Sequence, residues 1–476
     1  MLRWAIPLCC VALSEADSPV KPMVTWSTYL GVADCDDPAL WRGSLFLACH
    51  SPESDLPIQI AGSQRRGGTM AAYVLRLDLQ RGNVAYATRV QAEALTAALR
   101  ITTDEDGRAF VTGLARGPGL PVTDDAVQPH FGGGRSDAFL VAVAPDGQVA
   151  YGTYLGGAGD DVGNAVKLDG NGGVVVGGTT TSADFPGQTN AADRHADAFI
   201  SSWRLSNPSS HRSVVFGGSS EEKLTGIELD GKGGVFAVGF TKSNDFPVHH
   251  PVQPNLRGAS DLFLARIEVS DLTIAFSTYL GGSGDDSGWG VTVDGVGAPV
   301  VAGVTDSGDL PASDNAFQRM AHGGLDSFVA TLDGSGYEHL RLTYFGGSQD
   351  DSSGFDGENV RVDSHGRVWL VGLTASADLP VRNAVQDSYG GQTDGFVAVF
   401  SPRLTDLSFG TFCGGSGRDI LEGITDTPSG TVAVTGLTFS NDHPMPGRVI
   451  RQTRSSITVG GDVVNAFAWV FRNPSP

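Results

Sequence analysis

The sequence lacks the positive charge that binding to nucleic acid or to an anionic membrane requires. Asp and Glu number 53 against 32 Lys and Arg, so the formal net charge is -21. Both of those partners are bound through basic surfaces, and we expect neither here. The acidic excess is compatible with a cation, with a basic partner or with solubility alone.

Long apolar runs and a helical hydrophobic period are also missing. No apolar run approaches the roughly 18 residues that span a membrane, so we expect no transmembrane segment. The 65 Gly and 24 Pro accompany an ordinary hydrophobic fraction of 40%. Many turns, with enough apolar residues for a core, predict an all-β fold of short strands.

Catalytic motifs are absent from the sequence. The ten His residues are scattered, without the spacing of a His-Glu-x-x-His metal site. No Gly-x-Ser-x-Gly elbow is present, and Gly-x-Gly pieces such as Gly170 to Gly172 are hairpin turns rather than phosphate loops. We therefore expect no enzymatic activity and no required cofactor.

Cysteine is scarce, with five residues, and two of these lie in the apolar start of the chain. Residues 1–16 combine one positive charge, a short apolar run and a small-x-small ending, which predicts a secretory signal peptide and an extracellular or cell-envelope location. Its removal would leave Cys35, Cys49 and Cys413. A Cys35–Cys49 pair and three free thiols both remain open.

What the sequence does contain is a repeat of about 64 residues, marked by three motifs. The first motif ends a strand in Gly-Gly, as in Tyr279 to Gly282. The second is Asp-(Leu/Phe)-Pro, as in Asp309 to Pro311, and the third is Asp-x-Phe, as in Asp326 to Phe328. The second motif or a variant of it begins at residues 55, 119, 184, 245, 309, 378 and 442, so the chain holds seven copies.

Each copy contains four short β signals, which predicts a seven-bladed β-propeller of four-stranded antiparallel blades over residues 24–471. Residues 24–30 match the fourth strand of a copy, but no first three strands precede them. The seventh copy, in contrast, ends after its third strand. We therefore expect residues 24–30 to pair beside residues 466–471 and to close the ring. The expected blades are residues 39–90, 96–155, 162–216, 224–280, 288–345, 357–413, and 420–471 with 24–30.

The array resembles the bacterial seven-bladed β-propeller repeat family, often called SBBP repeats. The resemblance rests on Phe276 to Asp286, on the two strands between Val291 and Thr305, and on the Asp309 and Asp326 motifs. It is strong in copies three to seven and weaker in the first two. It implies a propeller in an extracellular setting and transfers no active site.

Six of the seven copies place a carboxylate just before the strand expected to be innermost. These residues could form an acidic ring at the channel mouth that attracts Ca²⁺. Alternatively, each could accept backbone N–H bonds in its own interblade turn. The six are Asp36, Asp161, Glu222, Asp286, Asp351 and Asp419.

In such blades the long Asp-Leu-Pro loops share one rim with the interblade turns, and this rim is the expected binding face. The sequence therefore predicts a monomeric scaffold that binds protein or glycan there. A glycan lyase or hydrolase with carboxylates at the channel mouth remains an alternative, as does a purely structural envelope module.

Overall fold

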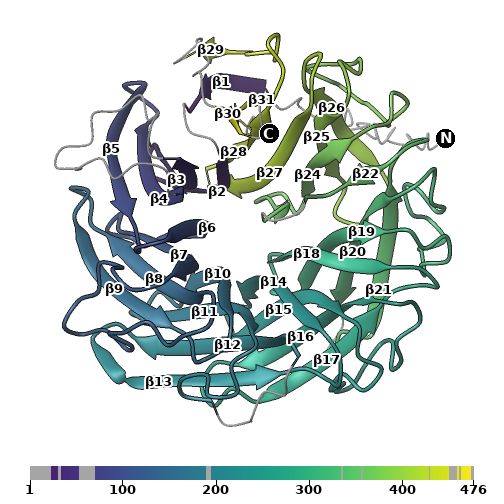
Figure 1. The fold of residues 1–476 in the computed structure, drawn as a ribbon. Coiled ribbons are helices and arrows are strands. Elements are labelled where there is room, and N and C mark those ends of the chain that lie inside the picture. Colours follow the sequence, from purple (N-terminus) through teal and green to yellow (C-terminus); the bar gives the residue numbers. More distant parts are fainter. Residues whose placement is uncertain are drawn as a thin grey trace, which may run out of the picture.

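The computed structural model describes residues 23–30, 34–52, 70–188, 195–333, 336–354, 358–427, 429–449, 458–459 and 462–472. The expected signal peptide and the Asp55 motif lie outside these residues. Within them every regular element is a β-strand, and seven antiparallel sheets stand around a central axis (Figure 1). The predicted seven-bladed β-propeller is confirmed.

The blades follow one another around the ring, and each runs from an innermost to an outermost strand. Blade one holds β2 (Asp34–Trp41), β3 (Ser44–Pro52), β4 (Met70–Asp78) and β5 (Asn83–Val90); blade two holds β6 (Leu95–Thr103), β7 (Ala109–Arg116), β8 (Asp137–Val143) and β9 (Val149–Leu155). Blade three holds β10 (Asp161–Leu168), β11 (Gly173–Thr180), β12 (Asp197–Arg204) and β13 (Asn207–Phe216); blade four holds β14 (Glu222–Leu229), β15 (Gly234–Thr241), β16 (Asp261–Glu268) and β17 (Ile274–Leu280). Blade five holds β18 (Asp286–Val293), β19 (Pro299–Thr305), β20 (Asp326–Asp333) and β21 (His339–Phe345).

Blades six and seven depart from this regular pattern. In blade six the innermost strand is split into β22 (Asp351–Ser352) and β23 (Val360–Val362), followed by β24 (Val368–Thr374), β25 (Asp394–Phe400) and β26 (Leu407–Cys413). Blade seven holds β27 (Asp419–Asp426), β28 (Thr431–Thr438) and β32 (Asn465–Arg472), with β29 (Arg448–Val449) at its edge; β30 (Thr458–Val459) and β31 (Asp462–Val463) pair with each other.

The first strand closes the ring, as the sequence predicts. β1 (Met23–Tyr29) pairs antiparallel with β32 and becomes the fourth strand of blade seven. Val24, Tyr29 and Leu30 are buried, and the Leu30 N–H donates to the Ala466 carbonyl at 2.9 Å. The two ends of the chain are therefore joined by backbone hydrogen bonds. The parallel pairing of β29 on the outer edge of β1 was not expected from the sequence.

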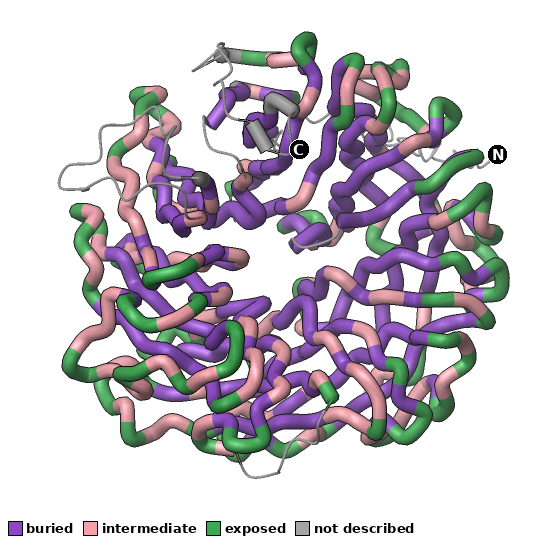
Figure 2. The backbone as a smooth tube through the Cα atoms, viewed as in Figure 1, coloured by how far each residue is buried: buried purple, intermediate pink, exposed green. Residues whose placement is uncertain are grey.

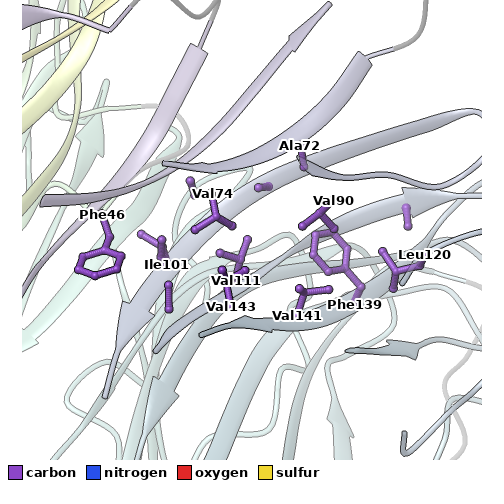
Figure 3. Close-up of a cluster of buried hydrophobic side chains, with 14 of the residues drawn as sticks. Phe46, Ala72, Val74, Val90, Ile101, Val111, Leu120, Phe139, Val141 and Val143 are labelled. Atoms are coloured by element: carbon purple, nitrogen blue, oxygen red, sulfur yellow. The ribbon is translucent and has the colours of Figure 1, made fainter. Parts of the chain in front are cut away.

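The hydrophobic core consists of separate clusters, one between each pair of neighbouring blades. Figure 3 shows the cluster between blades one and two, where Phe46 and Val74 face Ile101, Val111 and Phe139. A single blade cannot cover both of its faces, so each sheet is buried by its two neighbours. Most strand segments are accordingly buried, and the exposed segments lie mainly in the loops (Figure 2).

Candidate functional site

The three repeated motifs meet at one place, the joint between successive blades. At the joint between blades four and five, Asp286 Oδ2 accepts the Gly282 N–H at 2.7 Å. Asp309 Oδ1 accepts the Ser283 N–H at 2.8 Å. The motifs that define the repeat therefore build the turn that connects blades, and they place the long loops and interblade turns on the same rim, as expected.

Five of the six predicted acidic residues occupy this same turn position. Each is fully buried and accepts the N–H of the second glycine of the Gly-Gly motif; the five are Asp161, Glu222, Asp286, Asp351 and Asp419. Each also accepts a hydrogen bond from a Ser or Thr hydroxyl of the blade that it begins. The structure thus gives these carboxylates the turn role that was the alternative to a ring at the channel mouth.

Sequence reasoning missed two other residues of the joint. A serine two residues before the Asp-(Leu/Phe)-Pro motif, such as Ser307, donates to Asp286 and accepts the Gly284 N–H. A glutamine in the long loop, such as Gln253, donates to Asp261 and accepts the Gly281 N–H. Both recur at constant offsets in several copies, so an alignment of the copies against one another would have revealed them.

A second buried carboxylate, from the Asp-x-Phe motif, faces the first one across each of these joints. A Cβ added to Gly156 would lie 2.6 Å from Asp161 Oδ2 and 2.9 Å from Asp137 Oδ1, so only glycine fits between them. Burial, together with the neighbouring Asp161, raises the pKa of Asp137 to about 7. Burial raises the pKa of Asp326 and of Asp394 to about 7 in the same way.

These raised pKa values predict that the propeller loses stability between pH 5 and pH 8. A carboxyl whose folded pKa lies above its unfolded value binds more protons in the folded state, so its stabilising contribution is complete below about pH 4 and is lost as the pH rises through about 7. We expect the melting temperature to be several degrees higher at pH 5 than at pH 8. In Asp326→Asn this dependence should be shallower, whereas a pH dependence identical to that of wild type would contradict the assignment.

The sixth predicted residue, Asp36, belongs to a different position, which corrects its place in the acidic ring. Cys35 and Cys49 pair where Gly163 and Gly178 pair in blade three, and the strand then bulges. Asp36 is the bulged residue and corresponds to Asn164 rather than to Asp161. Similar bulges fall at Trp289 in blade five and at Glu422 in blade seven.

Around Asp36 the structure brings together three groups that could ligate a metal. Asp34 lies directly opposite His50 in the β2–β3 ladder, with 3.5 Å between His50 Nε2 and Asp34 Oδ2. His50 Nδ1 lies 3.7 Å from Asp36 Oδ2. Burial, followed by the charges of Asp34 and Glu422, raises the pKa of Asp36 well above its ordinary value.

A disulfide joins the two strands at this point. Cys35 and Cys49 are bonded, which settles the pairing that the sequence left open, and Cys413 is a buried free thiol. The register pair Cys35–Cys49 is the immediate neighbour of the pair Asp34–His50. The covalent bond therefore holds β2 and β3 together beside the acidic cluster.

The central channel is crossed by ion pairs. Lys167 of β10 lies 3.0 Å from Glu228 of β14 and 2.8 Å from Glu358, which precedes β23 on the far side of the ring. Arg361 contacts Glu358 as well. All four side chains are at most 19% exposed, so these charges pair as largely buried groups.

Further charged groups lie close to this network. Burial raises the pKa of Asp37 and of Asp426, while Arg361 and Lys167 act on both carboxyls in the opposite direction. Arg100 of β6 donates to the Thr225 carbonyl of β14 at 3.4 Å. Oppositely charged side chains thus pair across the channel, and this network links blades that are not neighbours.

The long loops, which start at the rim of the interblade turns and run back along the outermost strands, carry most of the large apolar side chains that are exposed in the described residues. Met320 is 66% exposed in the long loop of blade five, and Val381 and Val385 are 39% and 37% exposed in that of blade six. On the opposite rim Val296 borders a hollow of about 160 Å³ between blades five and six. Ligand pockets usually measure about 300–1,000 Å³, so that hollow is small for a ligand.

The tryptophans divide between packing and partial exposure. Trp203 and Trp369 are buried at 2% and 0% exposure, as interblade packing requires. Trp41 packs against the cluster between blades one and two and donates to the Glu105 carbonyl. Trp289 is half-buried at its bulge, with the Lys223 ammonium 5.1 Å from its ring centre.

Comparison with known proteins adds one distant relative in sequence. No protein-family model matches the chain. A regulatory protein of Caulobacter vibrioides, FlaEY, is 24% identical over 374 residues, covering 75% of this chain and 37% of that protein. The chain therefore spans little more than a third of that relative. No helix of the described residues is long and apolar enough to cross a membrane.

Two solved structures resemble the chain at low sequence identity and with TM-scores below 0.5. A Dyadobacter fermentans protein of unknown function covers 95% of this chain and 98% of its own at 11% identity, with a TM-score of 0.41. The quinohemoprotein alcohol dehydrogenase of Comamonas testosteroni covers 96% of this chain and 77% of its own at 9% identity, with a TM-score of 0.44. The class of the protein, a seven-bladed β-propeller, follows from its own sheet topology.

Proposed function

We propose that this propeller is an exported or cell-surface scaffold, belonging with the SBBP repeats, that binds a protein or glycan on its long-loop rim. The observation that carries the proposal is the set of exposed apolar side chains in the long loops of blades five and six, Met320, Val381 and Val385. Exposed apolar groups on neighbouring loops are characteristic of binding surfaces, and they favour a protein partner over a glycan.

Two other features support this proposal. The Cys35–Cys49 disulfide fits an oxidising compartment outside the cytoplasm. Ion pairs between Lys167, Glu228 and Glu358 cross the channel, so a binding partner would meet the outer surface before it could enter the ring. A glycan-active enzyme would instead need converging carboxylates that are free to reach a substrate.

The proposal predicts that binding to intact cells of the source organism depends on the rim. A labelled propeller should bind these cells, and the triple variant Met320→Ser, Val381→Ser, Val385→Ser should bind at least about tenfold more weakly, because each apolar contact in an interface contributes on the order of 1 kcal/mol or more. Cell-associated fluorescence across a titration measures the affinity. Protease or glycosidase treatment of the cells distinguishes a protein receptor from a glycan.

Val296→Ser is the matched control, since Val296 is 70% exposed on the opposite rim. It should leave binding unchanged. Equal binding by the triple variant, or equal loss in the Val296 variant, would contradict a site on the long-loop rim. Absence of binding by the wild-type protein would favour the structural envelope module.

A further inference from the structure

We infer that Asp34, Asp36 and His50 form a binding site for one divalent transition-metal ion of the Zn²⁺ class. Their ligand atoms all lie within 4.8 Å of one another. Ligands about 2.0–2.2 Å from a shared ion lie roughly 3–4 Å apart, so small side-chain rotations would complete the set. The inference is independent of what the long-loop rim binds.

The first argument is that buried polar atoms in the cluster lack partners. Asp36 Oδ2 and His50 Nδ1 are buried and make no hydrogen bond within the described residues, and the same is true of Asp34 Oδ1. The Asp36 side chain is only 6% exposed, and its unbonded oxygen is the one that faces His50. A buried carboxylate oxygen without a donor is costly, and a cation at this point would satisfy it.

The second argument is that no regular blade repeats this combination. The pair equivalent to Asp34 and His50 is Val162–Thr179 in blade three, Lys223–Phe240 in blade four and Ser287–Val304 in blade five. In blades two and seven it is Ala97–Leu114 and Ile420–Leu437. The joint carboxylates recur because every blade needs its turn. A group found in one blade alone is not required by the propeller framework.

The mixed ligand set selects the class of metal. Two carboxylates and one imidazole suit Zn²⁺ and related transition ions, whereas Ca²⁺ is bound almost entirely by oxygen. Three protein ligands leave a coordination position for water. The Ca²⁺ considered from the sequence therefore fits this cluster poorly, because one of its three groups is the His50 ring.

The framework keeps the ligands in place. Asp34 and Asp36 lie on either side of Cys35, and His50 follows Cys49, so the disulfide clamps the two ligand-bearing strands directly beside the cluster. The cation would also offset the negative charges of Asp34 and Glu422 that act on Asp36. Preorganised ligands of this kind lose little freedom on binding.

Zinc titration of the chelator-treated, disulfide-intact protein by calorimetry tests the inference. We expect one equivalent of Zn²⁺ to bind with a micromolar or lower dissociation constant. His50→Ala and Asp36→Asn should each weaken binding by at least about tenfold, since each removes a ligand. The control His339→Ala, which removes a 68% exposed histidine of β21, should bind as wild type does.

Cobalt provides a second measurement that reports the ligands themselves. Co²⁺ bound at the site should give a visible absorption band that is absent in His50→Ala, and millimolar Ca²⁺ should not abolish it. Replacement of the buried Asp36 could unfold the protein, so far-ultraviolet circular dichroism is used to check that each variant is folded. His50 is 18% exposed, and its replacement is therefore the milder change. Stoichiometric zinc binding that survives both substitutions, displacement by Ca²⁺, or no binding by wild type would overturn the inference.

Discussion

Removal of residues 17–31 is expected to lower the melting temperature by more than about 10 °C or to leave the protein insoluble. The deletion takes away β1, which forms six register pairs with β32. It also uncovers the apolar surface against which Val24, Tyr29 and Leu30 pack. Each of these side chains contributes on the order of 1.5–3 kcal/mol through burial, and the edge of β32 would be left open to other chains.

Addition of the missing strand as a peptide provides the control. A synthetic peptide of residues 17–31 should bind the truncated propeller and raise its melting temperature, whereas a peptide of the same composition in scrambled order should not. Differential scanning calorimetry measures both effects. An unchanged melting temperature after the deletion would show that side-chain contacts between blades close the ring without β1.

Replacement of Lys167 by Met is expected to cost about 3–5 kcal/mol of unfolding free energy. The substitution keeps the length of the side chain but leaves Glu228 and Glu358 without the ammonium that lies 3.0 and 2.8 Å from them. Removal of one partner from a buried ion pair leaves the remaining charge in a poorly solvated position without its counter-charge. Urea unfolding followed by fluorescence measures the difference.

The exposed pair Lys242–Glu221 supplies the comparison, since both side chains are 47% exposed. Lys242→Met should change the unfolding free energy by less than about 1 kcal/mol, because water screens a surface pair. If the two substitutions cost the same, the channel network would be no more important than a surface contact. A double variant, Lys167→Met with Glu358→Gln, should recover part of the loss.

Much of the fold follows from sequence reasoning because the repeat is local. The Gly-Gly turn and the Asp-(Leu/Phe)-Pro loop recur in the chain because each joint uses the same hydrogen bonds, as those of Asp286 and Asp309 show. The phase of the repeats also revealed the spare strand at residues 24–30. The split strand of blade six was not foreseen, because the segment between β22 and β23 departs from the repeat that served as the guide.

The candidate metal site was only partly accessible from the sequence. Asp36 drew attention as an acid near the start of a strand, but counting along the chain aligned it with Asp161. The β2–β3 ladder instead places Asp36 at the bulge, where Asn164 lies in blade three, and beside His50. A bulge leaves little trace in a sequence, so the grouping of Asp34, Asp36 and His50 needed the folded β2–β3 ladder.

The amino-acid sequence by itself determined the number of blades, the order of their strands and the means of closure. These depend on turns and alternating strands within about 64 residues, where short-range hydrogen bonds and side-chain alternation leave a repeated pattern. The tertiary structure alone decided which charges pair across the channel and where the candidate metal ligands Asp34, Asp36 and His50 meet. Lys167 and Glu358 come together only when blades three and six stand on opposite sides of a closed ring, and no local pattern records that contact.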